Sequence, residues 1–284
     1  MSAARQVEVP VGDHLLHYSV DGETFVGDEQ VMLDRDDDLL ASTPWASAGY
    51  GIAPFLAPDD HVALVAGITS LVGEVVGRHV GQPDGPFTLE RYHEVVTDDA
   101  VHREIVGELF AGGIPVADLP IPIERIEERA SELCGARVAT RCPDLDAAVV
   151  FVRIARPGAT TDHNPPHRDV WLDHLRHAVN GYAPLAGSTS RSSLALVPGS
   201  HRWPESAIER TAAGARIGSV VYEVPAVSGV TTASREMRLV RPDPRPNELL
   251  LFSPYLIHGG GINLQADTTR VSLELRFWRV GARP

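Results

Sequence analysis

Residues 161–171, TDHNPPHRDVW, contain the triplet His167-x-Asp169. On an extended strand, residues i and i+2 point to the same face, so an imidazole nitrogen and a carboxylate oxygen can reach one metal ion from one side. A histidine from a distant strand would complete a facial triad, the arrangement that holds non-haem Fe(II) with coordination positions left open. The chain offers His258 in SPYLIHGGG (253–261), followed by Arg270 and Ser272, which could hold a carboxylate.

A His-x-acid triplet alone is a weak signal, because 12 histidines in 284 residues produce about one by chance at average acidic usage. The competing triplet runs from His102 to Glu104, where apolar residues recur at helical spacing. On a helix, the side chains of residues i and i+2 point in nearly opposite directions, so they cannot bind the same metal ion. We therefore expect His102 and Glu104 on a helix surface, without a metal role. The alternative for residues 167–169 is a polar loop after two prolines.

Five short motifs follow one another in an order that is far more specific than the triplet alone: RPG (156–158), HRD (167–169), LVPGSH (196–201), PYLIHGG (254–260) and RVSLELR (270–276). In this order the chain resembles the phytanoyl-CoA dioxygenase superfamily of Fe(II)- and 2-oxoglutarate-dependent oxygenases. The resemblance covers the second half of the chain, and the first half carries no matching motif.

The resemblance implies that His167, Asp169 and His258 hold Fe(II), with 2-oxoglutarate as cosubstrate and O2 as oxidant. It implies that Arg270, helped by Ser272, binds the far carboxylate of 2-oxoglutarate. The spacing from the second histidine to this arginine is one residue longer than is usual in the family, so Arg276 stays an alternative. Two further residues, Arg153 and Asn180, are expected to contact the keto acid end. Halogenating relatives have a small residue in place of the carboxylate, so Asp169 favours oxygenation, desaturation or ring closure.

The segments DVWLD (169–173) and GYAPLAGST (181–189) are similar to a narrower group, the oxygenases that close orthoester or methylenedioxy bridges in oligosaccharide antibiotics, including hygromycin B. This similarity implies a small natural product as substrate, an aminoglycoside or oligosaccharide, and oxidative cyclisation or hydroxylation. Trp171 and Asp173 alternate with Asp169 and are expected to contact this substrate, the alternative being rim packing and solvation. Two other functions stay open, a hydroxylase of a lipid or amino acid and a non-catalytic β-sandwich binding protein.

The composition narrows the partners. The net charge of −13 argues against nucleic acid and anionic membranes and is compatible with a cationic small substrate, although solubility alone explains it equally well. Two cysteines and an N-terminus without an apolar segment indicate a cytoplasmic protein, and no apolar run approaches membrane-spanning length. The oligomeric state is left open.

The periodicities predict an α+β fold with a mainly β core. Short strands are expected within 6–33, helices at 62–76, 89–96, 100–110 and 122–134, and β runs at 147–154, 194–197, 219–224, 237–240, 248–252 and 271–278. The loop 40–56, with three aromatic residues, is either a lid or surface packing. We predict a double-stranded β-helix (jelly roll, cupin-like) with helices packed on one sheet, in a single domain 1–284. Residues 1–140 would support the core and 141–284 would form most of it.

The last predicted strand alternates in character. Its even positions from Arg270 to Arg276 are polar and its odd positions from Val271 to Phe277 are apolar. Because side chains alternate between faces with a period of two, one face is predicted to line the interior of the barrel and the other to join the apolar core.

Overall fold

The protein is described by a computed structural model that covers residues 5–20, 23–28, 31–32, 38–82, 85–110, 113–144, 147–148, 150–214, 216–217, 220–221, 228–259 and 261–281. Its helices are α1 (Pro58–Val80), α2 (Tyr92–Val95), α3 (Asp99–Phe110) and α4 (Ile123–Cys134), with short 3-10 turns η1 (Leu89–Arg91), η2 (Val116–Asp118), η3 (Asp169–Trp171), η4 (Asp173–Leu175), η5 (Ser200–Arg202) and η6 (Glu205–Ala207). Its strands are β1 (Arg5–Val11), β2 (His14–Val20), β3 (Thr24–Val26), β4 (Tyr50–Pro54), β5 (Val138–Ala139), β6 (Arg141–Cys142), β7 (Ala147–Ala148), β8 (Val150–Ala155), β9 (Ala178–Ala186), β10 (Ile208–Gly214), β11 (Arg216–Ile217), β12 (Val220–Val221), β13 (Ser228–Ala233), β14 (Glu248–Phe252) and β15 (Arg270–Arg279).

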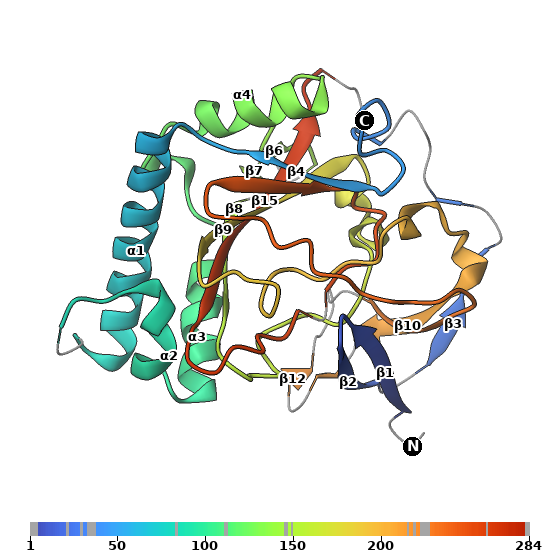
Figure 1. Cartoon of the computed structure of the whole chain (residues 1–284), viewed down its shortest axis with the longest axis horizontal. Coiled ribbons are helices and arrows are strands. Elements are labelled where there is room, and N and C mark those ends of the chain that lie inside the picture. The colour runs from blue at the N-terminus through green and yellow to red at the C-terminus, as the bar shows by residue number, and fades with distance from the viewer. Residues whose placement is uncertain are drawn as a thin grey trace.

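The largest sheet has six antiparallel strands. Its order is β4-β14-β9-β15-β5, and β8 also pairs with β15. Helices α1, α3 and α4 lie together on one side of this sheet, and the sheets that contain β1–β2 and β3–β10 lie on the other side (Figure 1). The mixed fold of antiparallel sheets with helices on one face confirms the predicted α+β jelly roll, although within the described residues the sheets do not close into a barrel.

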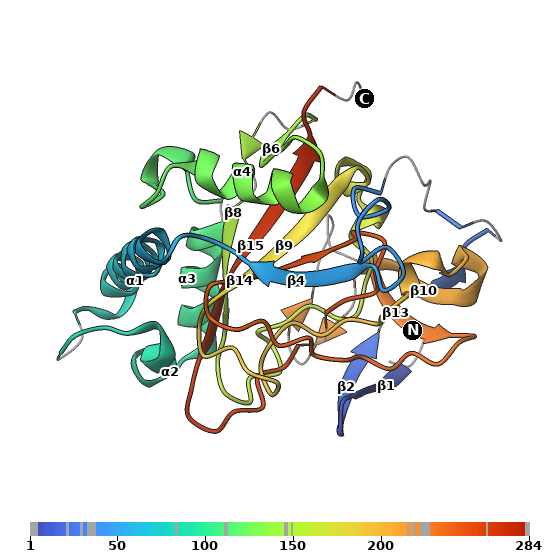
Figure 2. The ribbon, with the colours of Figure 1, turned by 45° about the horizontal axis from the view of Figure 1, so that its top comes forward.

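Strand β15 shows the predicted alternation. Val271, Leu273, Leu275 and Phe277 are fully buried in the core that the sheet shares with α1, α3 and α4. The opposite face is polar: Arg270, Ser272 and Arg276 are buried, and Glu274 is half-buried. Figure 2 shows the helices stacked against the outer face of β15, β8 and β9. Burying both faces of one strand fixes its register, because a slip by one residue would exchange polar and apolar faces.

The helices follow the signals in the sequence. Helix α1 begins with Pro58 and acidic residues in its first turn, and it continues past Gly77 to Val80, further than the apolar stripe predicted. Helix α4 ends at Gly135, whose left-handed backbone (φ 62°) closes the last turn as expected. By length and composition α1 could cross a membrane, contrary to the expectation from the sequence, but its stripe of buried side chains packs into the core as in the helix of a globular domain.

On the other side of the large sheet, the hairpin β1–β2 joins β11 and β12, while β3, β10 and β13 form a separate sheet. A second apolar core lies here, with Val9, Trp203, Ile208, Val230 and Ile257 among its buried members. Residues 194–197 and 237–240, predicted as strands, form isolated bridges instead: Leu196 bridges Val240 and His258, and Leu239 bridges Val11. Only part of the run 219–224 lies among the described residues, as β12.

The segment 40–56 is not a lid. Residues 39–49 form turns, and Tyr50–Pro54 is the edge strand β4. Phe55 is buried in the main core and Trp45 packs against it. A Cβ added at Gly51 would stand 2.0 Å from the Trp45 ring, so the glycine allows the indole to lie on the strand. The packing alternative is therefore the correct one. Both cysteines, Cys134 and Cys142, are buried and free.

Candidate metal centre

The two histidines of the predicted triad face each other across a short antiparallel bridge. The His167 amide donates to the His258 carbonyl and the His258 amide donates to the His167 carbonyl, each at 2.9 Å. The imidazole rings lie 4.3 Å apart between centroids. Gly259 makes this approach possible, because a Cβ at this position would lie 2.5 Å from the Pro165 carbonyl oxygen. Two loops far apart in sequence are thus joined at the point where both carry a candidate ligand.

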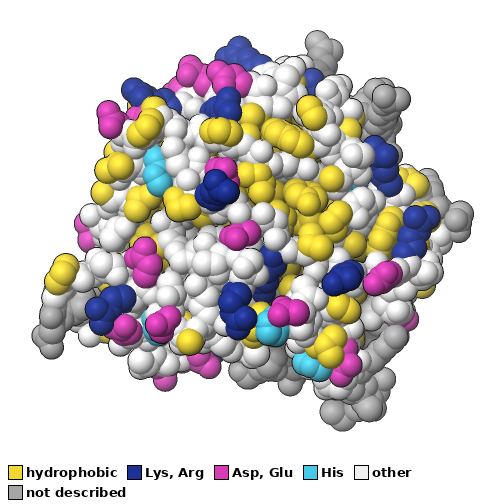
Figure 3. All heavy atoms as spheres, viewed as in Figure 1, with side chains coloured by type: hydrophobic (Ala, Val, Ile, Leu, Met, Phe, Trp, Pro, Cys, Tyr) yellow, Lys and Arg dark blue, Asp and Glu magenta, His cyan; other side chains and the backbone are white. Residues whose placement is uncertain are grey.

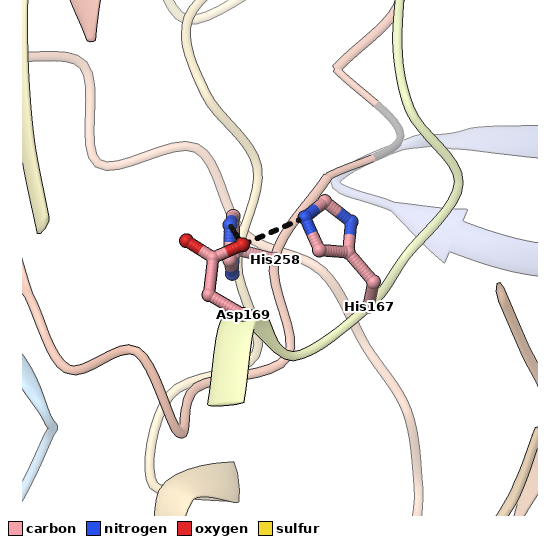
Figure 4. A group of neighbouring side chains, drawn as sticks. All are labelled: His167, Asp169 and His258. Atoms are coloured by element: carbon pink, nitrogen blue, oxygen red, sulfur yellow. Dashed lines mark ion pairs between the residues drawn. The ribbon is translucent and has the colours of Figure 1, made fainter. Parts of the chain in front are cut away.

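Asp169 completes the cluster. Its Oδ1 atom lies 3.2 Å from His167 Nε2 and 3.5 Å from His258 Nε2, and all three residues are buried (Figure 4). One ligand atom from each residue lies within 4.8 Å of the other two. The prediction that His167 and Asp169 share a strand face is wrong in detail. Asp169 begins the turn η3, and its amide donates to the Pro254 carbonyl at 3.0 Å, which turns the carboxylate toward the histidines.

The donor set fits a divalent transition metal. His167 Nδ1 lies 2.7 Å from the Pro165 carbonyl oxygen and His258 Nδ1 lies 3.0 Å from the Leu256 carbonyl oxygen. A backbone carbonyl can only accept, so both imidazoles carry their proton on Nδ1 and keep Nε2 free to bind a metal. Two imidazole nitrogens and one carboxylate oxygen on one side are the ligands of a facial triad, and the residues present therefore match an iron site.

The far oxygen of Asp169 is held by two donors. Arg276 approaches Oδ2 at 2.8 Å and the Asn180 side-chain amide donates to the same atom at 2.9 Å. Burial on its own raises the pKa of Asp169, but Arg276 and the two histidines together hold that pKa well below its usual value. The carboxylate therefore stays ionised, and only Oδ1 faces the histidines.

The network around Arg276 extends outward across the sheet. Arg276 also pairs with Glu274, and Glu274 accepts a hydrogen bond from Arg153 on β8. Burial raises the pKa of Glu274, but Arg153 and Arg276 outweigh it and lower the pKa to about 2. Arg153 and Asn180, expected at the keto acid, are both near the cluster: Asn180 touches Asp169 directly, whereas Arg153 is linked to it through Glu274 and Arg276.

Arg270 and Ser272 lie together on the inner face of β15. Arg270 donates to the Ser272 hydroxyl at 3.1 Å, and its guanidinium carbon lies 6.0 Å from the centroid of the Tyr182 ring. The Arg270 side chain is buried, yet its Nε has no hydrogen-bond partner within the described part of the chain. The Nε of Arg276 also lacks a partner there, but Arg276 pairs with two carboxylates, whereas Arg270 pairs with none among the described residues. Arg270 is therefore the one of the two arginines without a counter-charge.

Trp171 and Asp173 do not follow Asp169 along a strand. Both lie in 3-10 turns, so the expected alternation is wrong. The Trp171 indole donates to Glu205 at 3.2 Å, and the guanidinium of Arg210 lies 4.2 Å from the centroid of its ring. Asp173 is exposed. Their contact with a substrate stays a prediction, without the register argument that motivated it.

His102 departs from its predicted surface position. It lies on α3 as expected, but it is buried, with Nδ1 3.0 Å from the Tyr92 hydroxyl and Nε2 3.3 Å from Asp162. Asp162 is itself paired with Arg156 at 2.9 Å. Glu104 is exposed as predicted, so the triplet 102–104 does not share a metal. His102 is buried because it has polar partners on two other segments, Tyr92 on α2 and Asp162 on the loop that precedes His167.

Some residues around the centre gave no signal in the sequence. Arg168, between the candidate ligands His167 and Asp169, is fully buried and pairs with Glu205, which also binds Arg210 at 2.8 Å. This contact joins segments that no local pattern connects. The alternation of β15 predicted which face of the strand Arg276 occupies. It did not predict that Arg276 pairs with Asp169.

The fold and the three-residue cluster define a class, the non-haem iron enzymes of jelly-roll architecture that depend on 2-oxoglutarate. Residues 77–271, more than half of the chain, match the family model described as Phytanoyl-CoA dioxygenase (PhyH), and the chain belongs to this family. The predicted enzyme class and the cofactors Fe(II), 2-oxoglutarate and O2 are thereby confirmed.

Several solved structures resemble the protein. AviO1 from Streptomyces viridochromogenes Tue57 is 18% identical, with 89% of this chain and 98% of that chain covered and a TM-score of 0.47. The epimerase SnoN, in complex with Fe3+, alpha ketoglutarate and nogalamycin RO, is 17% identical, with 84% and 83% covered and a TM-score of 0.47. EctD from S. alaskensis in its apoform is 15% identical, with 99% and 86% covered and a TM-score of 0.44. No curated protein sequence matches the chain.

Proposed function

We propose that His167, Asp169 and His258 hold Fe(II) and that Arg270, with Ser272, anchors the far carboxylate of 2-oxoglutarate. The observation that carries the proposal is the convergence of two Nε2 atoms and one carboxylate oxygen in a buried cluster. When bound, Fe(II) together with 2-oxoglutarate and O2 supplies the oxidising power to remove a hydrogen atom from a substrate C–H bond.

The protein residues have separate tasks in this proposal. The two backbone carbonyls fix the imidazole tautomers, and Arg276 and Asn180 orient Asp169 so that one oxygen faces the metal. Burial of the three ligands keeps water away from them. The carboxylate of Asp169 occupies the place that a halide would need, which favours oxygenation, desaturation or ring closure.

The proposed substrate is a small natural product, an aminoglycoside or oligosaccharide, which is oxidatively cyclised to an orthoester or hydroxylated. The similarity of segments 169–173 and 181–189 to the oxygenases of oligosaccharide antibiotics supports this substrate class. The net charge of −13 suits a cationic ligand arriving from solvent. A lipid or amino acid hydroxylase is the second candidate. Membership of the PhyH family disfavours a non-catalytic binding protein. We place the enzyme in the cytoplasm, where its two buried thiols stay reduced.

The test is mass spectrometry of candidate substrates after incubation with the purified protein, Fe(II), 2-oxoglutarate and O2. Aminoglycosides, oligosaccharides, acyl-CoA esters and free amino acids form the panel. Loss of two hydrogens identifies ring closure or desaturation, and gain of one oxygen identifies hydroxylation. His167→Ala, Asp169→Ala and His258→Ala should abolish product, whereas the surface variant His79→Ala should not. Full turnover by any of the three ligand variants would remove that residue from the centre.

A further inference from the structure

Four side chains of alternating charge lead from the candidate metal centre outward across the large sheet. Asp169 pairs with Arg276 at 2.8 Å, Arg276 pairs with Glu274, and Glu274 pairs with Arg153. The same guanidinium nitrogen of Arg276, Nη2, contacts both carboxylates. Glu274 uses one oxygen for each arginine, Oε1 for Arg276 and Oε2 for Arg153. A change of charge at Glu274 therefore acts on the atom that holds Asp169.

The register of the sheet brings these charges together. Glu274 and Arg276 are two residues apart on β15, so their side chains point to the same face. On β8, Arg153 lies opposite Ser272, which makes Glu274 its diagonal neighbour, and long side chains can span such a diagonal. Arg153 also packs on Phe110, the last residue of α3, whose ring centroid lies 4.9 Å from the guanidinium carbon. The order of the charges thus follows from the pairing of the strands.

The two outer members of this series have opposite effects on Asp169. Glu274 is ionised at neutral pH, because Arg153 and Arg276 outweigh the effect of burial and hold its pKa at about 2. Since one guanidinium is shared by two carboxylates, Glu274 weakens the attraction of Arg276 for Asp169. Arg153 neutralises Glu274 and so restores part of that attraction. The negative charge that Asp169 offers to a cation should therefore rise with Glu274 and fall with Arg153.

We propose that Glu274 and Arg153 are positioning residues of the metal centre that act through Arg276, Glu274 by strengthening the binding of a divalent cation and Arg153 by weakening it. This inference rests on the proposed function for the identity of the metal. Neither residue touches the metal or a reacting atom. Both act by charge, and charges that are shielded from water interact more strongly than charges on the surface.

The experiment measures Fe(II) affinity by competition with a chelator, without oxygen and at pH 8, where carboxylates are ionised. Glu274→Gln keeps the size of the side chain, and its carbonyl oxygen still accepts from Arg276, so only the charge changes. It should bind Fe(II) about tenfold more weakly, an effect within the range of changes around metal ligands. Arg153→Gln should bind Fe(II) about threefold more tightly, the smaller size reflecting its greater distance and exposure. The double variant restores the net charge of wild type, so its affinity should lie between those of the two single variants.

Two kinds of control isolate the effect of position. Glu94→Gln and Arg91→Gln remove the same charges from an exposed pair and should change the Fe(II) affinity by less than about twofold. Arg153→Lys keeps the positive charge and should stay close to wild type. The second readout is the Fe(III)/Fe(II) reduction potential, which Glu274→Gln should raise and Arg153→Gln should lower, because Fe(III) carries the larger positive charge.

The sign of the change decides between the possible roles. Weaker Fe(II) binding by both single variants would show a merely structural role, and unchanged affinity in both would show that the charges do not affect Asp169. Either result overturns the proposal. If Glu274→Gln does not fold, the half-buried Arg153 still gives an answer, since Arg153→Gln must bind Fe(II) more tightly than wild type. If wild type binds no Fe(II), the proposed function fails and the inference with it; if wild type binds Fe(II) but the variants do not shift in opposite directions, the inference alone fails.

Discussion

Arg276 and Asp169 are joined by a buried contact of 2.8 Å that uses the carboxylate oxygen turned away from the two histidines. The arginine thus holds Asp169 ionised while leaving Oδ1 for a metal. This arrangement separates the two arginines of the inner face of β15. Arg276 pairs with the candidate metal ligand, and Arg270, six residues earlier and about 20 Å away along the strand, is the arginine that we propose for the cosubstrate.

The first prediction concerns this contact. Arg276→Met should weaken Fe(II) binding about 10- to 100-fold, because groups that orient a metal ligand have effects of this size. The measurement is competition for Fe(II) against a chelator without oxygen. Arg279→Met, at the exposed end of the same strand, should leave the affinity unchanged. Equal affinity in Arg276→Met and wild type would show that Asp169 does not depend on its arginine.

The second prediction separates Arg270 from Arg276. Arg270→Ala should lower the affinity for 2-oxoglutarate about 30- to several-thousand-fold, the equivalent of ~2–5 kcal/mol for a carboxylate that loses its charged partner. Arg270→Lys should restore only part, because an ammonium replaces a two-pronged guanidinium. A 2-oxoglutarate titration of the Fe(II)-loaded variants without oxygen measures this. Metal affinity should be retained in Arg270→Ala, and the opposite pattern in the two arginine variants would exchange their roles.

The third prediction tests the close approach of the two histidine loops. Gly259→Ala places a Cβ 2.5 Å from the Pro165 carbonyl oxygen and 3.1 Å from His167 Nδ1, at a backbone φ of +112° that side chains rarely adopt. The strained backbone alone costs about 1–3 kcal/mol, and the clash moves His167 from His258. Both the melting temperature and Fe(II) affinity should fall.

The neighbouring glycine provides the control for this variant. A Cβ at Gly261 would meet its nearest atom, the Ser193 carbonyl oxygen, at 3.5 Å, an ordinary contact. Gly261→Ala should therefore stay within about 1 kcal/mol of wild type in unfolding free energy. If both variants behave alike, the spacing of the two histidine loops is not set by Gly259.

How far the sequence predicted the structure depends on whether a feature is local. The alternation of β15 and the end of α4 at Gly135 were predictable, because a strand period and a left-handed glycine need only neighbouring residues. The burial of His102 was not, since helical periodicity places it but cannot reveal that Asp162 and Tyr92 approach it from elsewhere.

The candidate site shows the same division. The three residues of the candidate cluster were predictable from the order of motifs, but the way Asp169 reaches the histidines was not. It depends on the hydrogen bond from its amide to Pro254, which ends the extended segment and places Trp171 beside Glu205 instead of along a strand. Contacts between segments far apart in sequence decided each of these differences.

The fourth prediction is a pH dependence of stability that comes from His102. Burial lowers its pKa in the folded protein to about 4, whereas an unfolded histidine titrates near 6.5. Between these values the unfolded chain binds more protons, so the stabilisation is complete above the unfolded pKa and is lost as the pH falls toward 4. Between pH 7 and pH 5 this one residue accounts for about 2 kcal/mol.

Urea unfolding of metal-free wild type and His102→Gln, measured at several pH values, checks this. The glutamine variant should lose less stability between pH 7 and pH 5, and above pH 7 the two curves should run parallel. Identical slopes over the acidic range would mean that His102 is protonated in the folded protein. His163 and His201, whose pKa values burial also lowers to about 4, contribute with the same sign in both proteins.

The last prediction concerns the ion pair that supports the ligand segment from inside. Glu205 is buried and accepts from Arg168, Arg210 and the Trp171 indole. Glu205→Gln keeps the shape but leaves the fully buried Arg168 without a counter-charge, which should cost about 3–5 kcal/mol in unfolding free energy. Because Arg168 lies between His167 and Asp169, Fe(II) affinity should fall as well. Glu132→Gln, which removes an exposed pair with Arg129, should change stability by less than about 1 kcal/mol. A Glu205→Gln protein as stable as wild type would mean that Arg168 finds compensation elsewhere, and loss of stability with unchanged metal affinity would show that the pair supports the fold without positioning the ligands.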